Sequence, residues 1–497
     1  MSQLKKGALL SYITIFLTNI IGLLLTPFII KKLGDAEYGL YTLIGAFVGY
    51  ISVLDFGLNN TIVRFVAKYR AEKDKKGEEN FLAITMGIYG VIAVIIVLVG
   101  VVLYFNLDTI FSNSLTLEEL SKAKVMFIVL IFNLAITLPG GAFTAICSGY
   151  EHFVFPRTVN IIRYLVRSLM VVGLLLLGGD AIGLVILDTV MNILVIVFNG
   201  FYVLKKLKVV FKLHYFETPL VKEIFSYSVW IFIYTLVHQF QWNTGQIILG
   251  VNTDTVVVAI YGVGVLIGGY YAAFGGAINR LLLPKATRMV VDGIDGLELT
   301  ETMIKFGRIN SYVLTLIISG FFLFGQEFIS FWVGEKYSQS WLIGLVMMFV
   351  LTLPLIQGFG ISILEAKKKN RFKSILSVIT VGLAILFGFY FSKQNGVIGV
   401  IIPLGFAILL NNIIMNFYYK RIFDFKIYYF FKMTLFKLGV ITIALIVVFM
   451  FVKTIYIIET WLKLIIFILI YSVSYISLIY QFLLNKYEKK ILIDKFR

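Results

Sequence analysis

Long apolar runs are the feature that most constrains this sequence: they span about 18 to 25 residues each, and the charged residues gather between them. An α-helix rises 1.5 Å per residue, so such a run crosses a hydrocarbon layer of roughly 30 Å. Backbone polar groups in lipid must be bonded within the segment, which predicts helices, and the alternating pattern of a membrane barrel is absent. Hydrophobic residues make up 60% of the 497 residues and charged residues 14%, which excludes a soluble globular chain.

The prediction is therefore an all-α polytopic membrane protein with about fourteen transmembrane helices. An amphipathic stretch from Pro284 to Phe306 is expected to lie on the membrane surface. The predicted spans are 9–30, 39–63, 81–104, 123–146, 158–178, 181–204, 226–249, 255–279, 309–325, 341–362, 374–392, 396–419, 438–453 and 460–484.

Lysine and arginine are distributed unequally between the two sides that these spans define. Of the 44 basic residues, 36 fall on the side of both termini and 8 on the opposite side. The positive-inside rule therefore predicts that both termini are cytoplasmic. The net charge of +17 is then a topology signal with some attraction to anionic lipid heads, and no nucleic-acid partner is expected.

The chain also contains an internal repeat. Thr-Leu-Pro at 137–139 recurs at 352–354, and Ile-Gly at 182–183 recurs at 398–399, shifts of 215 and 216 residues. Seven such matches keep this shift and the same place in the helix order. Each repeat holds six spans, an even number, so the two repeats are parallel and enter the membrane from the same side.

This repeat predicts the domain organisation. We expect an N-terminal six-helix lobe at 1–210, a second six-helix lobe at 211–425, and two additional helices with a cytoplasmic tail at 426–497. Two parallel six-helix repeats that face a central cavity are typical of transporters that work by alternating access.

The sequence offers little for catalysis or for a metal site. Its single cysteine, Cys147, excludes an intramolecular disulfide, and three scattered histidines do not make a metal site. No P-loop or His-Glu-x-x-His pattern is present, and no connection exceeds about thirty residues. The region from Met1 to Lys6 is not followed by a cleavage site, so no cleaved signal peptide is expected. We expect a transporter without cofactor or metal rather than an enzyme.

Ionisable residues inside the spans are costly in lipid and are the first functional candidates. Arg163 and Arg167 are four residues apart and share a helical face with Asn160. Arg167 lies roughly 13 Å into its span, which is deep for a side chain that reaches the interface. The two arginines are predicted to contact an anion in the cavity. The alternative is an ion pair with Asp55 or Asp188, and these carboxylates are candidates either for that pair or for carrying a coupling cation.

Polar residues are also concentrated in the predicted span 226–249. His238, Gln241 and Trp242 share one helical face there. Amide groups and an indole suit sugar hydroxyls and the apolar face of a sugar ring, so a substrate-facing role is predicted for these residues, and Asn160 is a further candidate for sugar binding. The alternative is hydrogen bonding between helices.

Arg64 and Arg280 occupy equivalent positions in the two repeats, at the cytoplasmic ends of their spans. They are predicted to form a basic rim where an anionic head group enters. The alternative is ordinary anchoring of the span ends.

Several motifs together resemble a known family. Lys-Lys-Gly-Ala-Leu-Leu-Ser-Tyr leads the first span at 5–12, Leu-Asp-Phe-Gly-Leu lies at 54–58, and Phe-Trp-Val-Gly-Glu-Lys-Tyr lies at 331–337. With Lys-Lys-Leu-Gly-Asp-Ala-Glu-Tyr-Gly-Leu-Tyr at 31–41 and Arg-Phe-Val-Ala-Lys-Tyr-Arg at 64–70, this resembles the polysaccharide biosynthesis family of flippases (Wzx type). That family belongs to the multidrug/oligosaccharidyl-lipid/polysaccharide exporter superfamily.

The resemblance implies a flippase that moves an undecaprenyl-pyrophosphate-linked oligosaccharide from the cytoplasmic to the outer leaflet of a bacterial cytoplasmic membrane. The implied partners are this lipid-linked substrate, membrane lipids and the polysaccharide polymerase machinery. It also implies that the arginines bind pyrophosphate. Lipid II flippases of similar architecture carry cationic residues in the first span, whereas this chain has none between Lys6 and Lys31, which disfavours lipid II.

Two other functions are weighed against this one. A multidrug or small-cation exporter of the same superfamily would favour acidic residues in the cavity over arginines. A membrane-embedded polysaccharide polymerase or glycosyltransferase usually needs a large extracytoplasmic loop, and the longest one here has about 18 residues.

Overall fold

The computed structural model describes residues 3–112, 114–216, 218–279, 282–367, 369–485 and 488–489. The described residues form helices and no strand, so the predicted all-α class is confirmed. They group into two compact units: the first comprises 1–259 and 389–396, and the second comprises 260–388 and 397–497.

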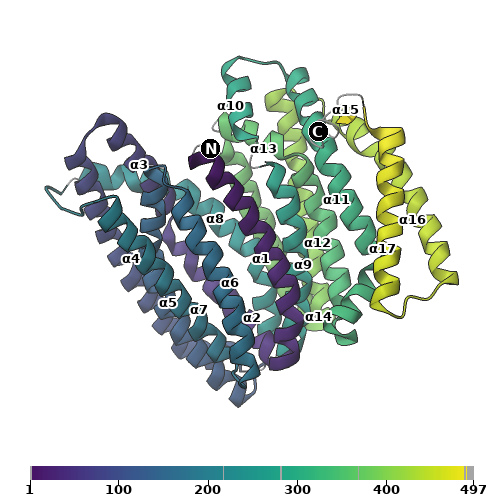
Figure 1. Ribbon diagram of the computed structural model, residues 1–497, viewed down its shortest axis with the longest axis horizontal. Helices are drawn as coiled ribbons and strands as arrows, with labels where there is room; N and C mark the ends of the chain where they lie inside the picture. Colours follow the sequence, from purple (N-terminus) through teal and green to yellow (C-terminus); the bar gives the residue numbers. More distant parts are fainter. Residues whose placement is uncertain are drawn as a thin grey trace. The chain divides into compact units, whose positions relative to one another are not determined.

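In the first unit, α4, α5 and α7 pack side by side (Figure 1), and α6 packs on both α1 and α7. α8 packs on α2 and on the short segment that follows α2. The elements are α1 (Gln3–Leu33), α2 (Asp35–Ile51), η1 (Ser52–Asp55), α3 (Leu58–Glu72), α4 (Lys75–Ile110), α5 (Leu117–Gly149), α6 (Val154–Leu176), α7 (Ala181–Phe201), η2 (Tyr202–Lys206) and α8 (Thr218–Asn252).

The second unit is organised around α11, which packs on α12, α13, α16 and α17. α9 and α14 each contain residues of both units. The elements are α9 (Thr255–Asn279), α10 (Leu283–Val291), α11 (Gly296–Val333), η3 (Glu335–Tyr337), α12 (Gln339–Ile356), α13 (Gly358–Ala366), α14 (Asn370–Phe423), α15 (Ile427–Phe431), η4 (Lys432–Phe436), α16 (Lys437–Ile455), α17 (Trp461–Leu478) and η5 (Ile479–Leu483).

Each of the fourteen predicted spans lies on helical segments of the structure. In the described part of the chain, twelve helices are long and apolar enough to cross a membrane. One of them, α14, has 54 residues and covers two predicted spans, because Gly396 has non-helical angles (φ 49°, ψ −124°) and divides it. α8 covers the predicted span 226–249.

Three predicted spans differ from the structure, and one of them, 341–362, is interrupted between the end of α12 at Ile356 and the start of α13 at Gly358. The span 39–63 is not one continuous helix, because the chain leaves the helix after Asp55, where Phe56 and Gly57 have φ of 52° and 71°. The span predicted to begin at 309 begins at Gly296, where Asp295 caps the helix by accepting a hydrogen bond from the backbone amide of Glu298. The expected surface helix is therefore only α10, and the rest of that stretch belongs to α11.

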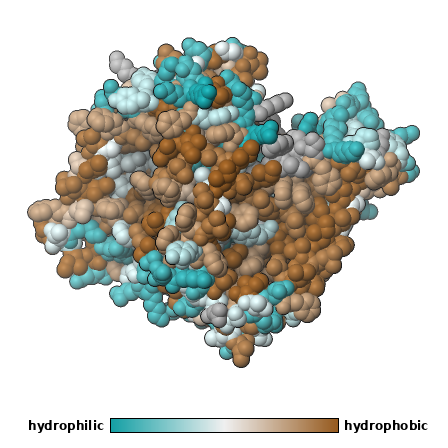
Figure 2. Space-filling model, turned by 180° about the vertical axis from the view of Figure 1, so that it is seen from behind, coloured by the Kyte–Doolittle hydropathy of each residue, from teal (hydrophilic) through white to brown (hydrophobic). Residues whose placement is uncertain are grey.

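The outer surface is apolar in the way that lipid requires. Figure 2 shows brown, hydrophobic residues over most of one face, with teal, hydrophilic residues gathered toward its upper and lower margins. Exposed apolar side chains follow one stripe of α4 at spacings of three and four residues: Val91, Val94, Leu98, Val102 and Phe105. In water such a stripe would be an association surface, whereas in a bilayer it is the expected lipid-facing side.

The two compact units are not the two repeats. The first unit reaches beyond residue 210 and includes α8 and the start of α9, because α8 packs on α2. The two six-helix lobes at 1–210 and 211–425, with the addition at 426–497, stay a prediction from the repeat.

Candidate functional site

Arg167 forms an ion pair within the first unit. From α6, its Nε and Nη2 donate to the two carboxylate oxygens of Asp188 on α7, with Nη2 at 2.9 Å from Oδ2. The hydroxyl of Tyr41 on α2 donates to the same Oδ2 at 3.3 Å. Of the two carboxylates that the sequence offered as partners for this arginine, the structure therefore selects Asp188. A bidentate pair of this kind neutralises most of the arginine charge before any substrate arrives.

Arg163, one turn earlier on α6, is not engaged in this way. Its Nε is buried and has no hydrogen-bond partner among the described residues, and its guanidinium carbon lies 5.5 Å from the centroid of the Tyr164 ring. The amide of Asn160 donates to the backbone carbonyl of Pro156 at 3.0 Å. Because a buried donor without a partner costs free energy, Arg163 has donor capacity left for an anion.

Asp55 is the last residue of η1 and directly precedes the break that divides the predicted span. Its Oδ1 accepts hydrogen bonds from the hydroxyl of Tyr89 on α4 at 2.9 Å and from the amide of Asn59 on α3 at 3.1 Å. Its structural partners are therefore uncharged, and the ion pair with an arginine that was one of the alternatives is not formed among the described residues.

The polar face of α8 brings two of its predicted residues together. The rings of His238 and Trp242 lie with their centroids 6.1 Å apart. His238 is exposed, whereas Gln241 and Trp242 are half-buried. On the side of α8 that packs on α2, the amide of Asn243 donates to Gln239 and lies against Gly49. A hydrogen bond between helices is formed here by Thr244 of α8 with the Tyr50 hydroxyl of α2, whereas the substrate-facing role of His238, Gln241 and Trp242 stays a prediction.

Of the two predicted rim arginines, Arg64 belongs to the described residues. Arg64 is exposed on α3, and its guanidinium carbon lies 5.9 Å from the centroid of the Phe65 ring. Arg280 lies outside the described residues.

A close contact between α2 and the start of α9 was not predicted. A Cβ built on Gly39 would lie 1.8 Å from the carbonyl oxygen of Thr255, so only glycine allows the two backbones to approach this closely. The Thr255 hydroxyl donates to Glu119 on α5 at 2.7 Å. Nearby, Lys122 on α5 donates to Glu37 on α2 at 3.3 Å. By the predicted topology this contact lies at the extracytoplasmic end of the spans, and it joins the first sequence repeat to the second.

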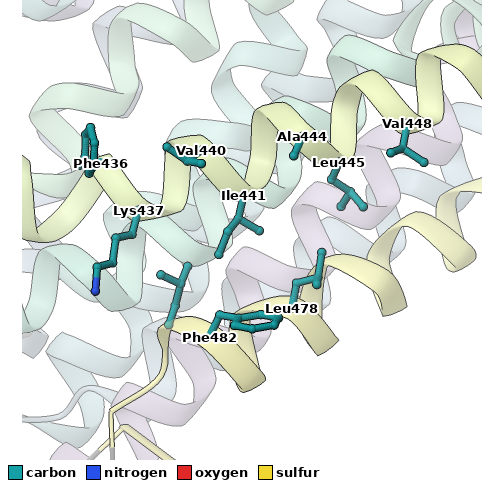
Figure 3. Close-up of a pocket in the computed structure, with 10 residues that line it drawn as sticks. Phe436, Lys437, Val440, Ile441, Ala444, Leu445, Val448, Leu478 and Phe482 are labelled. Atoms are coloured by element: carbon teal, nitrogen blue, oxygen red, sulfur yellow. The ribbon is translucent and has the colours of Figure 1, made fainter.

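The second unit has an apolar groove on its two additional helices. Figure 3 shows side chains of α16 and of the α17–η5 segment that line it, with Lys437 at one end. Its volume is about 520 Å³, and Val440, Ala444, Leu478 and Phe482 are among the residues that line it. The sequence identified these helices only as spans, because a groove depends on how two helices pack. In the part of the chain that the structure describes, no group of three or more histidine, cysteine or acidic side chains could hold a metal ion.

Comparison with known proteins places these features in a family context. A model of the family described as polysaccharide biosynthesis protein matches residues 4–278, more than half of the chain. The uncharacterized membrane protein EpsK of Bacillus subtilis (strain 168) is 22% identical over 506 aligned residues, which cover 98% of this chain and 96% of EpsK.

Solved structures share the fold. The lipid II flippase MurJ in an inward closed conformation has a TM-score of 0.66 and 17% identity, covering 95% of this chain and 98% of MurJ. An inward-facing multidrug resistance MATE family transporter of the MOP superfamily has a TM-score of 0.61 and 14% identity, covering 84% of this chain and 94% of the transporter. At identities of 17% and 14%, the likeness establishes that this chain shares the fold of these two proteins.

Proposed function

Because the chain belongs to the polysaccharide biosynthesis protein family, we propose that it is a flippase for a lipid-linked oligosaccharide. It moves an undecaprenyl-pyrophosphate-linked substrate from the cytoplasmic to the outer leaflet of a bacterial cytoplasmic membrane. The surface polysaccharide machinery then uses that substrate. The family match carries this proposal, and the fold shared with the lipid II flippase MurJ supports it.

Within the site, the difference between the two arginines of α6 refines the expected role of each. Arg167 is already neutralised by Asp188, so its contribution is to fix α6 against α7. Arg163 has a buried Nε without a partner, and a guanidinium group suits bidentate contact with phosphate oxygens. Arg163 is therefore the arginine that contacts the pyrophosphate.

The sugar part of the substrate lies against the exposed face of α8. His238 and Trp242 present two rings there, and Gln241 adds an amide on the same face. Rings pack on the apolar faces of sugars, and amides bond to hydroxyl groups. The absence of Lys and Arg between Lys6 and Lys31 supports a substrate other than lipid II.

The proposed mechanism is alternating access by the two six-helix repeats around a central cavity, with both termini in the cytoplasm. Reporter fusions to the C-terminus test this topology. Cytoplasmic activity of the reporter is expected, and extracytoplasmic activity would mean an odd number of spans.

The role of Arg163 is tested by glycan export. In a host from which the gene is deleted, the wild type and Arg163→Ala are compared for surface glycan and for abundance in the membrane. Arg157→Ala is the matched control, because Arg157 lies on the same helix and stacks over Phe153 at 5.5 Å. We expect Arg163→Ala to abolish export at normal abundance while Arg157→Ala retains it. Normal export by Arg163→Ala would refute the pyrophosphate contact.

A multidrug or small-cation exporter is the second candidate, supported by the fold shared with the MATE transporter. Ethidium efflux from cells that produce the protein distinguishes the two. Efflux that is unaffected by Arg163→Ala, with normal surface glycan in the deletion strain, would favour the exporter.

A further inference from the structure

Asp55 lies at a break inside a membrane-spanning segment. The span from Asp35 to Glu72 is apolar enough to cross a bilayer, yet its helix is interrupted between α2 and α3. Phe56 adopts a left-handed φ of 52°, a conformation that L-residues avoid unless the surrounding structure holds them there. The Phe56 ring is held by stacking on Phe232 of α8, with centroids 4.6 Å apart. Packing from another helix thus fixes Asp55 at this interruption.

The groups placed against the Asp55 carboxylate are all neutral. The Tyr89 hydroxyl and the Asn59 amide donate to Oδ1 at 2.9 and 3.1 Å. η1 packs on α2, α4, α5 and α8, and of these α4 supplies the titratable Tyr89. No described charged side chain forms an ion pair with Asp55.

Three other acids that are buried or half-buried in the described helices have a cationic partner, whereas the buried Glu78 accepts a hydrogen bond from the Tyr150 hydroxyl at 2.6 Å. Asp188 is paired with Arg167, Glu327 with Lys453 at 2.7 Å, and Glu488 with Arg308 at 2.8 Å. A carboxylate held inside a span without such a partner is costly in its ionised form. Uptake of one small cation removes that cost, and release of the cation restores it.

We propose that Asp55 is the carboxylate that takes up and releases the coupling proton of this transporter. This inference rests on the proposed transport function and names the ion that drives it. When Asp55 is ionised, the Tyr89 hydroxyl donates to it. When Asp55 carries the proton, its O–H donates to the Tyr89 oxygen, because a phenol hydroxyl can accept as well as donate. The hydrogen bond between Asp55 and Tyr89 therefore persists in both protonation states without rearrangement of the helices.

The geometry favours a proton over a sodium ion. A hard metal cation needs several oxygen ligands that turn their lone pairs toward it. Here the carboxylate is surrounded by donors, which present hydrogen atoms to it. Among the described residues, Asp55 belongs to no group of three or more acidic, histidine or cysteine side chains that could hold a metal ion.

Infrared difference spectroscopy tests this on the purified full-length protein in lipid nanodiscs, at high and low pH and without glycan substrate. A protonated carboxyl group gives a C=O stretching band that its ionised form lacks. We expect a band component in the wild type that titrates with pH and disappears in Asp55→Asn. Asp108→Asn is the control, because Asp108 is an exposed residue paired with Lys124. It should retain the component.

Two further variants keep the test decisive if Asp55→Asn does not fold. Tyr89→Phe keeps the ring and removes the hydroxyl, so the same component should persist at a shifted frequency and midpoint. Asp55→Glu should retain a titrating component. A component that survives in Asp55→Asn, or that is unchanged in Tyr89→Phe, overturns the assignment. Loss of the component at constant pH when sodium replaces potassium identifies a sodium site and overturns the proton.

The spectroscopic result does not depend on the glycan. A band assigned to Asp55 in a protein that exports no glycan would leave the proton site standing while the proposed substrate fails. Glycan export by a protein whose Asp55 does not titrate would support the proposed substrate and overturn the proton site.

Discussion

Gly39 offers the sharpest quantitative prediction, because the structure leaves no room for a side chain there. An added Cβ would lie 1.8 Å from the Thr255 carbonyl oxygen, and real Cβ atoms essentially never approach within 3.0 Å. In Gly39→Ala the carbonyl must therefore retreat by about 1.2 Å, measured from 1.8 to 3.0 Å. The atom in the way belongs to the backbone of α9, so a side-chain rotation cannot relieve the clash.

The expected size follows from overpacking. One extra methyl group in a tightly packed contact costs typically about 1–3 kcal/mol. At roughly 1.4 kcal/mol per factor of ten, this shifts the equilibrium between closed and open contact by about 5- to 150-fold. Gly45→Ala on the same helix is the matched control, because nothing lies within 4 Å of its Cβ. Alanine is the better helix former, so this control should be neutral or slightly stabilising.

Thiol labelling measures the opening of this contact. Cys147 is first replaced by Ser, and Ala259→Cys then places a probe one turn from Thr255 at a position with 0% exposure. We expect a water-soluble maleimide to label this probe about 5- to 150-fold faster in Gly39→Ala, with no change in Gly45→Ala. An unchanged rate in Gly39→Ala, or an equal increase in both variants, would refute the reasoning.

Three further predictions concern the charge pairs and the face of α8. Arg167→Ala should lower the thermal unfolding temperature in detergent, because it leaves the charge of Asp188 uncompensated and reduces the free energy of unfolding by about 3 kcal/mol. The double variant Arg167→Met/Asp188→Leu should recover most of this stability. No recovery would mean that the ion pair itself is required. Glu488→Gln should speed tryptic cleavage after Lys489 about tenfold, because Glu488 forms an ion pair with Arg308. Glu459→Gln is the control and should leave the cleavage rate unchanged, because Glu459 forms an exposed pair with Lys463. Equal cleavage rates in the two variants would contradict the role of Glu488. In the Cys147→Ser background, His238→Cys should label readily with the same maleimide and the buried Val237→Cys should not, whereas the reverse pattern would show that α8 turns its other face to water.

Hydropathy alone was sufficient to predict the helices, because each apolar run must satisfy its own backbone in lipid. The same reasoning missed the break after Asp55. Nothing in the local sequence forces Phe56 into the left-handed region, and its conformation is held by stacking on Phe232, a residue 176 positions later. The early start of α11 at Gly296 was missed because hydropathy marks where a helix enters lipid, whereas the cap at Asp295 decides where it begins.

The sequence identified candidate residues and two possible carboxylate partners for the arginines, but it could not choose between those partners. Spacing on one helix identified Arg163, Arg167 and Asn160 as one face, and depth in the span identified the arginines as unusual. Which arginine is neutralised depends on the register between α6 and α7, which no local pattern encodes. For the same reason Tyr41 and Tyr89 were not identified, since each meets its aspartate through the packing of another helix.

The most direct test of the proposed flippase function follows the lipid-linked substrate itself. In a deletion strain, undecaprenyl-pyrophosphate-linked oligosaccharide is quantified by mass spectrometry, and its leaflet is determined with a membrane-impermeant sugar-modifying reagent. The account predicts that this intermediate accumulates in the cytoplasmic leaflet, that surface glycan is lost, and that wild-type protein but not Arg163→Ala reverses both. A deletion strain with normal surface glycan and no accumulated intermediate would contradict it.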